Sequence, residues 1–188
     1  MMRMNLIMSN EYRLIQIVLS HSKSQEWDNA VEEWKIWDYE EDSSCERSCI
    51  CGKEHIKYLF RICNKVNGNM LFPIGSSCIR KFGRLDLNEE VDIVEGIFKL
   101  LHVVRDNEFI ELSSEYFSRK IINWLYDECA FDNEYNDYEG TADYEFFLKM
   151  FNKRDKYLIS SKQWSKIRAI IAYSLKPFLE EKLADKMK

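Results

Sequence analysis

Apolar and polar residues alternate in the segment 55–64, HIKYLFRICN. The apolar side chains occupy every second position, and Lys57 and Arg61 lie between them, so the pattern predicts a β-strand with one solvated face. The dipeptide Asn67-Gly68 follows, and it is a strong signal for the turn of a β-hairpin. This part of the chain is therefore expected to form a hairpin.

Three further short elements are predicted around this turn. The segment 70–74, MLFPI, predicts the second strand, and Pro73, which has no N–H, belongs near its end or on a sheet edge. The segment 75–83, GSSCIRKFG, predicts a short helix with a serine cap and with Gly83 as its stop. Upstream, the segment 34–42, WKIWDYEED, predicts a strand or an extended arm.

Helical periodicity dominates the rest of the chain. The first predicted helix has one apolar face, formed by Leu87, Val91, Val94, Phe98 and Leu101. A second amphipathic helix should open at Ser113 or Ser114. Ser160 and Gln163 have the spacing of a capping box before a last helix. Pro177 should kink or break that helix, because its ring clashes with the preceding turn.

Together these elements predict an α+β fold that is mainly helical. We expect N-terminal helices in 1–34, a small zinc-binding module in 35–84, and a helical domain in 85–188. With only 6 Gly and 2 Pro in 188 residues, the chain has few breaks, which favours helix. The sequence contains no run of 18 apolar residues, so it predicts no membrane span. The start, MMRMNLIMSNEYRL, lacks the apolar region and the small-residue cleavage site of an export signal, so we expect a cytoplasmic protein.

Charge is distributed in alternating blocks, although the net charge is only −5. Residues 31–51 carry seven acids and two bases, and residues 52–84 carry seven bases and one acid. Residues 85–148 carry 17 acids and four bases, and residues 149–188 carry 11 bases and four acids. Either the blocks pair with one another inside the protein, or a basic block faces an anionic partner. The candidate partner-binding bases are Lys53, Lys57, Arg61, Lys65, Arg80, Lys81 and Arg84.

Four cysteines surround the predicted hairpin. Cys45, Cys49 and Cys51 precede it, and Cys78 lies in the first turn of the short helix that follows it. In a reducing cytoplasm, clustered cysteines indicate a metal more often than a disulfide. The order matches a treble-clef zinc site, in which a tight turn called the knuckle supplies one pair of ligands and a helix start supplies the rest. Gly52 after Cys51 suits such a turn, because glycine adopts the left-handed backbone that it requires.

The fourth ligand of the predicted zinc site is left open by the sequence. We favour Cys45, then His55, then Cys63, so the predicted set is Cys45, Cys49, Cys51 and Cys78. Such a closed set of four ligands is structural, because no position remains for a reacting water. Cys129, far along the chain and flanked by apolar residues, is expected to be a core residue.

Other interpretations of the cysteines predict different chemistry. They could be buried free thiols, or they could form disulfides. A metal-dependent nuclease of treble-clef type would use His55 at the start of the hairpin, but the segment 75–83 offers no second His or Asn to complete such a site. The sequence therefore predicts no catalytic residues, and the nuclease stays as the alternative function.

The motif residues resemble a family of proteins. CICGK in 49–53 and LFPIGSSCI in 71–79 are similar to small zinc-finger proteins of phages and mobile elements of low-GC bacteria, and MFNKRDKYLISSKQWSKI in 150–167 is similar to their helical region. The resemblance covers residues 34–84, and 145–180 more loosely. It implies a metal-binding accessory protein, such as a counter-defence factor of the anti-CRISPR type. The family's cysteines carry over to Cys49, Cys51 and Cys78, but Cys45 does not match with the same specificity.

Two modes of action follow from these features. In the first, the basic residues of the zinc module bind DNA, RNA or a host nucleoprotein complex, with an affinity that falls steeply with salt. In the second, the acidic stretches occupy a groove that a host nuclease uses for nucleic acid. Both make the chain a non-catalytic interaction protein, and neither involves a membrane.

Overall fold

The computed structural model describes residues 9–106 and 108–188 and divides the chain into two compact units. Unit 1 consists of the described residues up to Val91 together with Lys186–Lys188, and unit 2 is Asp92–Asp185. The fold is α+β with one small antiparallel sheet and many helices, as the sequence predicts. Of the N-terminal segment MMRMNLIMSNEYRL, on which the expectation of no export signal rests, residues 1–8 lie outside the described residues.

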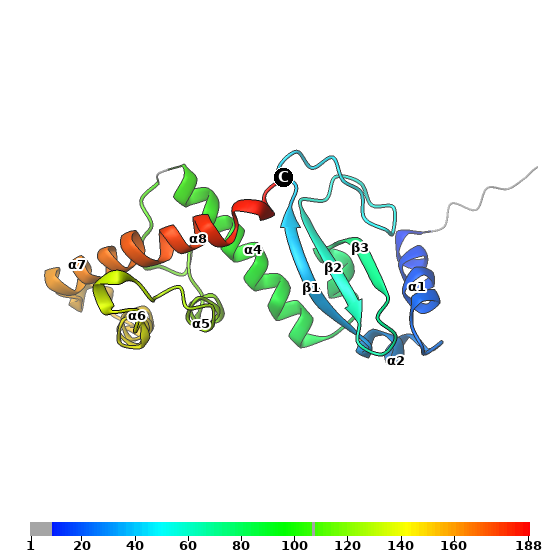
Figure 1. The fold of residues 1–188 in the computed structure, drawn as a ribbon, viewed down its shortest axis with the longest axis horizontal. Coiled ribbons are helices and arrows are strands. Elements are labelled where there is room, and N and C mark those ends of the chain that lie inside the picture. The colour runs from blue at the N-terminus through cyan, green and yellow to red at the C-terminus, as the bar shows by residue number, and fades with distance from the viewer. Residues whose placement is uncertain (1–8, 107) are drawn as a thin grey trace, which may run out of the picture. The chain divides into compact units, whose positions relative to one another are not determined.

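Unit 1 is built around a three-stranded antiparallel sheet in the order β1-β2-β3 (Figure 1). Its elements are α1 (Asn10–His21), α2 (Trp27–Glu32), β1 (Trp34–Glu41), β2 (Tyr58–Asn64), β3 (Met70–Gly75), α3 (Ser76–Arg80) and the start of α4 (Leu85–Arg105). The segment WKIWDYEED is thus a strand, and the hairpin β2–β3 is present. Pro73 lies in β3, which is an edge strand.

The face of β2 that the sequence predicts to be solvated is so only in part, since Arg61 and Cys63 on this face are half-buried and Leu59 is not exposed at all. Phe60 and Ile62 are fully buried, and so is Leu59, whose side chain points to the opposite face. The reason is that β2 is the central strand and that α3 packs against both β2 and β3. In register, Phe60 pairs with Tyr39 of β1 and with Ile74 of β3, so the middle of this strand is the core of unit 1.

A buried carboxylate ties the helical start of the chain to the hairpin. Glu33, which is 8% exposed, accepts hydrogen bonds from the N–H groups of Lys23 and Ser24, both at 2.7 Å, and from Asn64 Nδ2 at 2.6 Å. Burial raises the pKa of Glu33, but these hydrogen bonds, from Asn64 first, outweigh it and hold the pKa below its usual value. Asn64 in turn receives the N–H of Val66 on Oδ1, which shapes the hairpin turn.

Unit 2 is helical (Figure 1). Its elements after α4 are α5 (Arg119–Asp127), α6 (Thr141–Asn152), α7 (Ser161–Ile170), the π-helical turn η3 (Ile171–Leu175), α8 (Lys176–Lys182) and the 3₁₀ turns η1 (Glu134–Asn136), η2 (Lys156–Leu158) and η4 (Ala184–Lys186). The apolar face predicted for the long helix α4 is confirmed, since each of its five residues is at most 4% exposed.

Helix boundaries in unit 2 agree with the sequence in part. The capping box is confirmed, because Ser160 and Gln163 exchange the expected hydrogen bonds. The start predicted at Ser113 or Ser114 is wrong, since Ser118 caps α5 and its side chain accepts the N–H of Ile121. Instead of a break before Pro177, the structure has the π-helical turn η3, and the proline lies in the first turn of α8, where its missing N–H is tolerated.

No helix in residues 9–106 and 108–188 has the length and apolar character needed to cross a membrane.

The Glu33 network predicts a specific pH dependence of stability. Because the folded state lowers the pKa of this carboxyl, its contribution is complete above the unfolded value of about 4.3 and is lost as pH falls through the folded pKa. We expect Glu33→Gln to reduce the free energy of unfolding by about 1–3 kcal/mol at pH 7. The difference from wild type should shrink as the pH is lowered from 5 to 3 in chemical-denaturation experiments.

The matched control is Asp28→Asn, which changes an exposed carboxylate in the same part of the chain. This control should stay within about 0.5 kcal/mol of wild type. An equal loss for both variants, or a difference that grows towards acid pH, would contradict the role given to Glu33.

Candidate metal centre

The segment 49–53 forms the tight turn that the sequence predicts as a knuckle. The N–H of Cys49 donates to the carbonyl of Lys53 at 2.8 Å, and the N–H of Gly52 donates to the carbonyl of Cys49 at 2.7 Å. Gly52 has φ 91°, a left-handed conformation that glycine adopts without a Cβ penalty. The Lys53 N–H also points at Cys51 Sγ, at 3.4 Å. The turn therefore presents both cysteine sulfurs to the same side.

The knuckle docks against the end of β3, where α3 begins. The N–H of Ile50 donates to the carbonyl of Pro73 at 2.9 Å, and the N–H of Gly75 lies 3.4 Å from Cys49 Sγ. Gly75 is the N-cap residue of α3 and no side-chain cap is present, so the predicted serine cap is wrong. Cys78 follows in the first turn of α3, and the chain thereby brings its sulfur to those of the knuckle.

Three sulfur atoms meet in the interior of unit 1. The Sγ atoms of Cys49, Cys51 and Cys78 all lie within 4.8 Å of one another, with 3.6 Å between Cys49 and Cys78 and 3.4 Å between Cys51 and Cys78. The three residues are 4%, 1% and 3% exposed. Two sulfurs bound tetrahedrally to one ion at Zn–S distances of about 2.3 Å would be about 3.8 Å apart. The cluster therefore has the dimensions of a thiolate metal site.

Electrostatics in the cluster favour one thiolate at Cys49. The sulfur–sulfur contact with Cys78 lowers the pKa of Cys49, against the effect of burial, and the N–H groups of Cys51 and Gly75 add to this. The Cys78 thiol has a raised pKa, because of the same contact, its burial and the neighbouring Cys51 sulfur. Further deprotonation of the cluster requires a cation close to the sulfurs.

The other cysteines and His55 lie apart from this cluster. Within the described residues, the group that could hold a metal contains Cys49, Cys51 and Cys78 but not Cys45. Cys45 is half-buried, and its carbonyl lies 3.0 Å from Nδ1 of the exposed His55. Cys63 is half-buried in β2, and its Sγ contacts the carbonyl of Asn64 at 3.6 Å. The structure thus brings together three of the four predicted ligands, and the fourth ligand stays a prediction.

Cys129 is not a core residue, contrary to the sequence analysis. It is exposed and follows the end of α5 with φ 62°. The apolar residues beside it, Ala130 and Phe131, are buried, but the left-handed backbone at Cys129 turns its own side chain outwards.

The loop that carries Cys45 is organised by Asp42, which the sequence analysis did not single out. Asp42 is 4% exposed, and its carboxylate accepts from Ser44 Oγ at 2.6 Å and from the N–H groups of Ser44, Glu46 and Arg47 at 2.9–3.1 Å. These bonds, that from the Ser44 hydroxyl first, hold the pKa of Asp42 below its usual value despite burial. Asp42 with Ser44 two residues later is the sequence signature of such a local turn.

Three of the seven candidate partner-binding bases form ion pairs inside unit 1. Lys57 Nζ lies 3.3 Å from the fully buried carboxylate of Glu41, and Lys81 Nζ lies 3.0 Å from Glu11. Arg84 pairs with Asp86 and also donates to the carbonyls of Val31 and Trp34, and its side chain is only 11% exposed. The interpretation that the charge blocks pair within the protein therefore holds for these residues.

The remaining four bases lie at separate places. The Arg61 guanidinium lies over the ring of Phe72 at 4.3 Å, and Lys53 Nζ lies 3.4 Å from Ser77 Oγ. Lys65 is exposed in the hairpin loop, and Arg80 is half-buried in α3. Lys53 and Lys65 thus belong to different loops, one in the knuckle and one in the β2–β3 turn.

If the cluster binds a metal, substitution of its three cysteines should have a different effect on bound metal from substitution of a cysteine outside it. Cys49→Ser, Cys51→Ser and Cys78→Ser should each reduce the bound metal of the purified protein from one equivalent to near zero, because each removes a thiolate from the cluster. Each variant should also unfold at a lower temperature than wild type. Metal content by elemental analysis and thermal unfolding by circular dichroism measure the two effects.

Cys129→Ser is the matched control, since Cys129 is exposed and outside the cluster, and it should keep the full equivalent of metal. Cys45→Ser, His55→Ala and Cys63→Ser test the three candidates for the fourth ligand, because only the variant that removes it should lower the metal content. Wild-type protein that is purified without metal and is as stable in a strong chelator as without it would contradict the metal centre.

No protein-family model matches the chain, and no curated protein or solved structure matches it. The resemblance of residues 34–84 to zinc-finger proteins of mobile elements stays an expectation from the sequence.

Proposed function

We propose that this chain is a non-catalytic, zinc-stabilised interaction protein in which unit 1 is a treble-clef-like module. The observation that carries the proposal is the meeting of three buried sulfurs, from Cys49, Cys51 and Cys78, within 4.8 Å. One Zn²⁺ ion held by these thiolates and a fourth ligand would join the knuckle to α3 and to the end of β3. Its binding free energy would be folding free energy, on the order of 10 kcal/mol in zinc-finger peptides.

The donor set supports zinc in a structural role. Three thiolates select soft or borderline ions such as Zn²⁺ over Mg²⁺ or Ca²⁺, which take oxygen ligands. Catalytic zinc sites keep a position that is open to water and substrate. Here each cysteine is at most 4% exposed, so a substrate has no access to the ion. The small sheet of unit 1 would depend on the metal for its stability.

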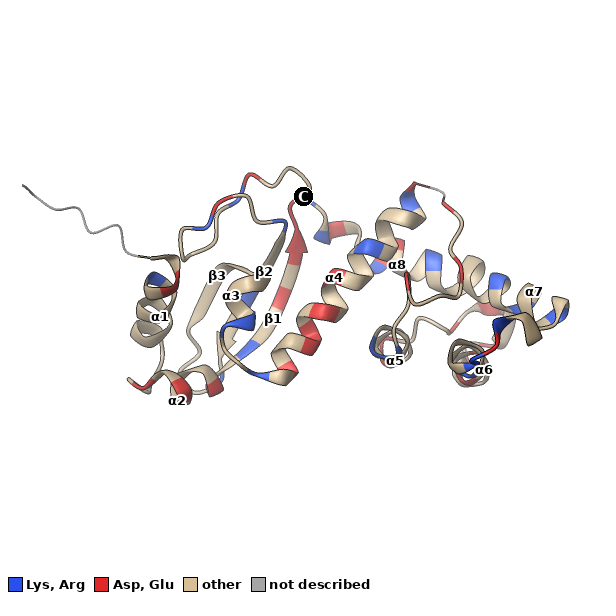
Figure 2. Cartoon of the chain, turned by 180° about the vertical axis from the view of Figure 1, so that it is seen from behind, with Lys and Arg blue, Asp and Glu red and all other residues tan. Residues whose placement is uncertain are grey.

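The charge distribution favours a nucleoprotein partner over free nucleic acid. Lys57, Lys81 and Arg84 are engaged with acids of unit 1, so they are poorly placed to neutralise a row of phosphates. The acids of β1, Asp38, Glu40 and Glu41, pair with bases of unit 1. Acidic residues also follow one another along α4 (Figure 2), where Glu89 and Glu90 are exposed. Together with the resemblance to mobile-element proteins, this supports a role as an inhibitor of host defence, of the anti-CRISPR type, that contacts the nucleic-acid groove of a host complex through its acids.

If the chain inhibits a host CRISPR system, it should protect an invading phage from that system. Expression of the chain in a low-GC bacterium with an active CRISPR system should raise the plating efficiency of a targeted phage by at least tenfold. Cys51→Ser should abolish the effect because the module loses its metal, and a double charge reversal of the exposed Glu89 and Glu90 should weaken it. Charge reversal of the exposed Glu180 and Glu181 of α8 is the matched control and should leave it unchanged.

Two results would contradict the proposed function. One is an unchanged plating efficiency although the zinc-loaded protein accumulates in the cell. The other is metal-dependent cleavage of DNA or RNA by the purified protein that His55→Ala abolishes, which would make the chain a nuclease.

A further inference from the structure

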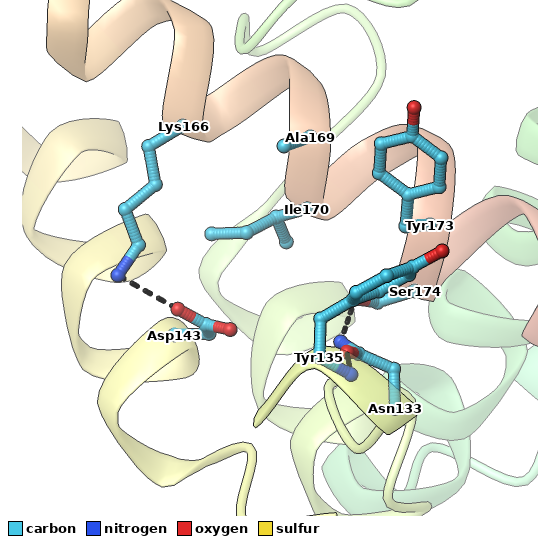
Figure 3. Close-up of a pocket in the computed structure, with 8 residues that line it drawn as sticks. All are labelled: Asn133, Tyr135, Asp143, Lys166, Ala169, Ile170, Tyr173 and Ser174. Atoms are coloured by element: carbon cyan, nitrogen blue, oxygen red, sulfur yellow. Dashed lines mark hydrogen bonds and ion pairs between the residues drawn. The ribbon is translucent and has the colours of Figure 1, made fainter. Parts of the chain in front are cut away.

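Unit 2 contains a cavity of about 410 Å³ that the metal centre does not involve. It lies between η1, the start of α6 and the face of α7 and η3 that carries Lys166, Ile170 and Tyr173 (Figure 3). Its volume is in the range of small-molecule sites, which is about 300–1,000 Å³. Its two ends differ in character, since one is aromatic and the other is charged.

Two tyrosines form the aromatic end. The rings of Tyr135 and Tyr173 lie 5.5 Å apart between centroids with an angle of 62° between their planes, and both line the cavity (Figure 3). Tyr135 is 74% exposed and Tyr173 is 60% exposed, so both keep most of their ring surface accessible. Exposed aromatic rings at the edge of a cavity are suited to stacking on a flat ligand.

The aromatic end is held in place by a polar network. Asn133 Oδ1 accepts the N–H of Tyr135 at 2.7 Å, and Asn133 Nδ2 donates to Ser174 Oγ at 2.7 Å. Ser174 is 4% exposed and lies in the π-helical turn η3, next to Tyr173. The two tyrosines, 38 positions apart in sequence, are therefore positioned by one asparagine and one π-helical turn, a feature that is frequent at functional sites.

Lys166 and Asp143 form the charged end. Lys166 Nζ lies 2.8 Å from Asp143 Oδ1, and the other oxygen of Asp143 accepts from Asn136 Nδ2 at 3.0 Å. Lys166 Nζ also lies 4.8 Å from the centre of the Phe146 ring. Both carboxylate oxygens are thus engaged, while the Lys166 side chain is 46% exposed, and its ammonium has three N–H donors, so one can turn to an incoming acceptor.

The distance between the two ends matches a specific class of ligand. Lys166 and Tyr173 are seven positions apart on one helical face, which corresponds to about 10 Å along the axis. The apolar side chain of Ile170 lies between them and lines the cavity (Figure 3). A ligand that spans the site needs a flat ring at one end, a compact middle and an anion at the other end.

We propose that this cavity binds a nucleoside phosphate, with the base against Tyr135 and Tyr173 and the phosphate at Lys166. The sugar lies over Ile170. Base–aromatic stacking and positive charge are the two elements that proteins combine for single-stranded nucleotides. The site goes beyond the interaction role of unit 1 and does not rest on the metal centre, because all its residues belong to unit 2.

Isothermal titration of the full chain tests the site with four probes, namely adenosine 5′-monophosphate, adenosine, inorganic phosphate and a six-residue single-stranded oligoadenylate. The monophosphate should bind, adenosine should bind about tenfold more weakly, and inorganic phosphate alone should give no heat. Oligoadenylate that binds more tightly than the monophosphate and is displaced by it identifies a strand as the source of the nucleotide. Oligoadenylate that binds no more tightly identifies a free nucleotide.

Variants locate the binding. Tyr173→Ala should weaken the affinity for the monophosphate by about 5- to 150-fold, since a stacked base contributes about 1–3 kcal/mol. Lys166→Gln should weaken it and reduce its salt dependence. Ala169→Phe, at a position that lines the cavity, should block it by filling the space. The matched controls are Tyr157→Ala, which removes an 81% exposed tyrosine, and Lys149→Gln, since neither residue lines the cavity.

The proposal is overturned if 1 mM monophosphate gives no heat with protein that melts as wild type does. It is also overturned if Tyr173→Ala and Tyr157→Ala lose the same affinity, or if tetramethylammonium binds in place of the monophosphate, since the last result would make Asp143 and the tyrosines a cation site. Each outcome is independent of metal content and of phage plating, so it is distinguishable from a failure of the role proposed for unit 1.

Discussion

Three buried thiols meet in the interior of unit 1. Cys51 and Cys78 are 27 positions apart, yet their sulfurs approach to 3.4 Å, and Cys49 completes the group. Three protonated thiols would gain little from this arrangement, and three thiolates would repel one another strongly. A cation among them would remove the repulsion and turn the close approach into binding free energy. It would also hold the knuckle, the end of β3 and the start of α3 at one point.

Ion pairs inside unit 1 limit which of its charged side chains can contact a partner. Bases of residues 52–84 pair with acids of residues 31–51, as in the pair between Lys57 and the buried Glu41. Arg84 has a similar internal role, because it holds the carbonyls of Val31 and Trp34. A nearly neutral module suits recognition by shape and local acids. The cavity of unit 2 is lined instead by two tyrosines and by the ion pair of Lys166 with Asp143.

The cysteine cluster was largely predictable from the sequence, because it depends on residues that are neighbours along the chain. Gly52 after a cysteine and Cys78 at a helix start define the cluster, because both requirements are set by neighbouring residues. The sequence did not predict features that depend on contacts between residues far apart in the chain. Leu59 is buried in the central strand β2, and Cys129 is exposed just after α5 with a left-handed backbone, and no flanking residue indicates either. Tyr135 was missed for the same reason, since its partner in the cavity comes from another helix.

The central claim is that sulfur holds a metal ion inside unit 1. X-ray absorption at the zinc K-edge measures the identity and distance of the atoms around the ion in purified protein. The account predicts a first shell with at least three sulfur atoms at about 2.3 Å. A shell of only nitrogen and oxygen, or protein that contains no metal and is folded, would contradict it.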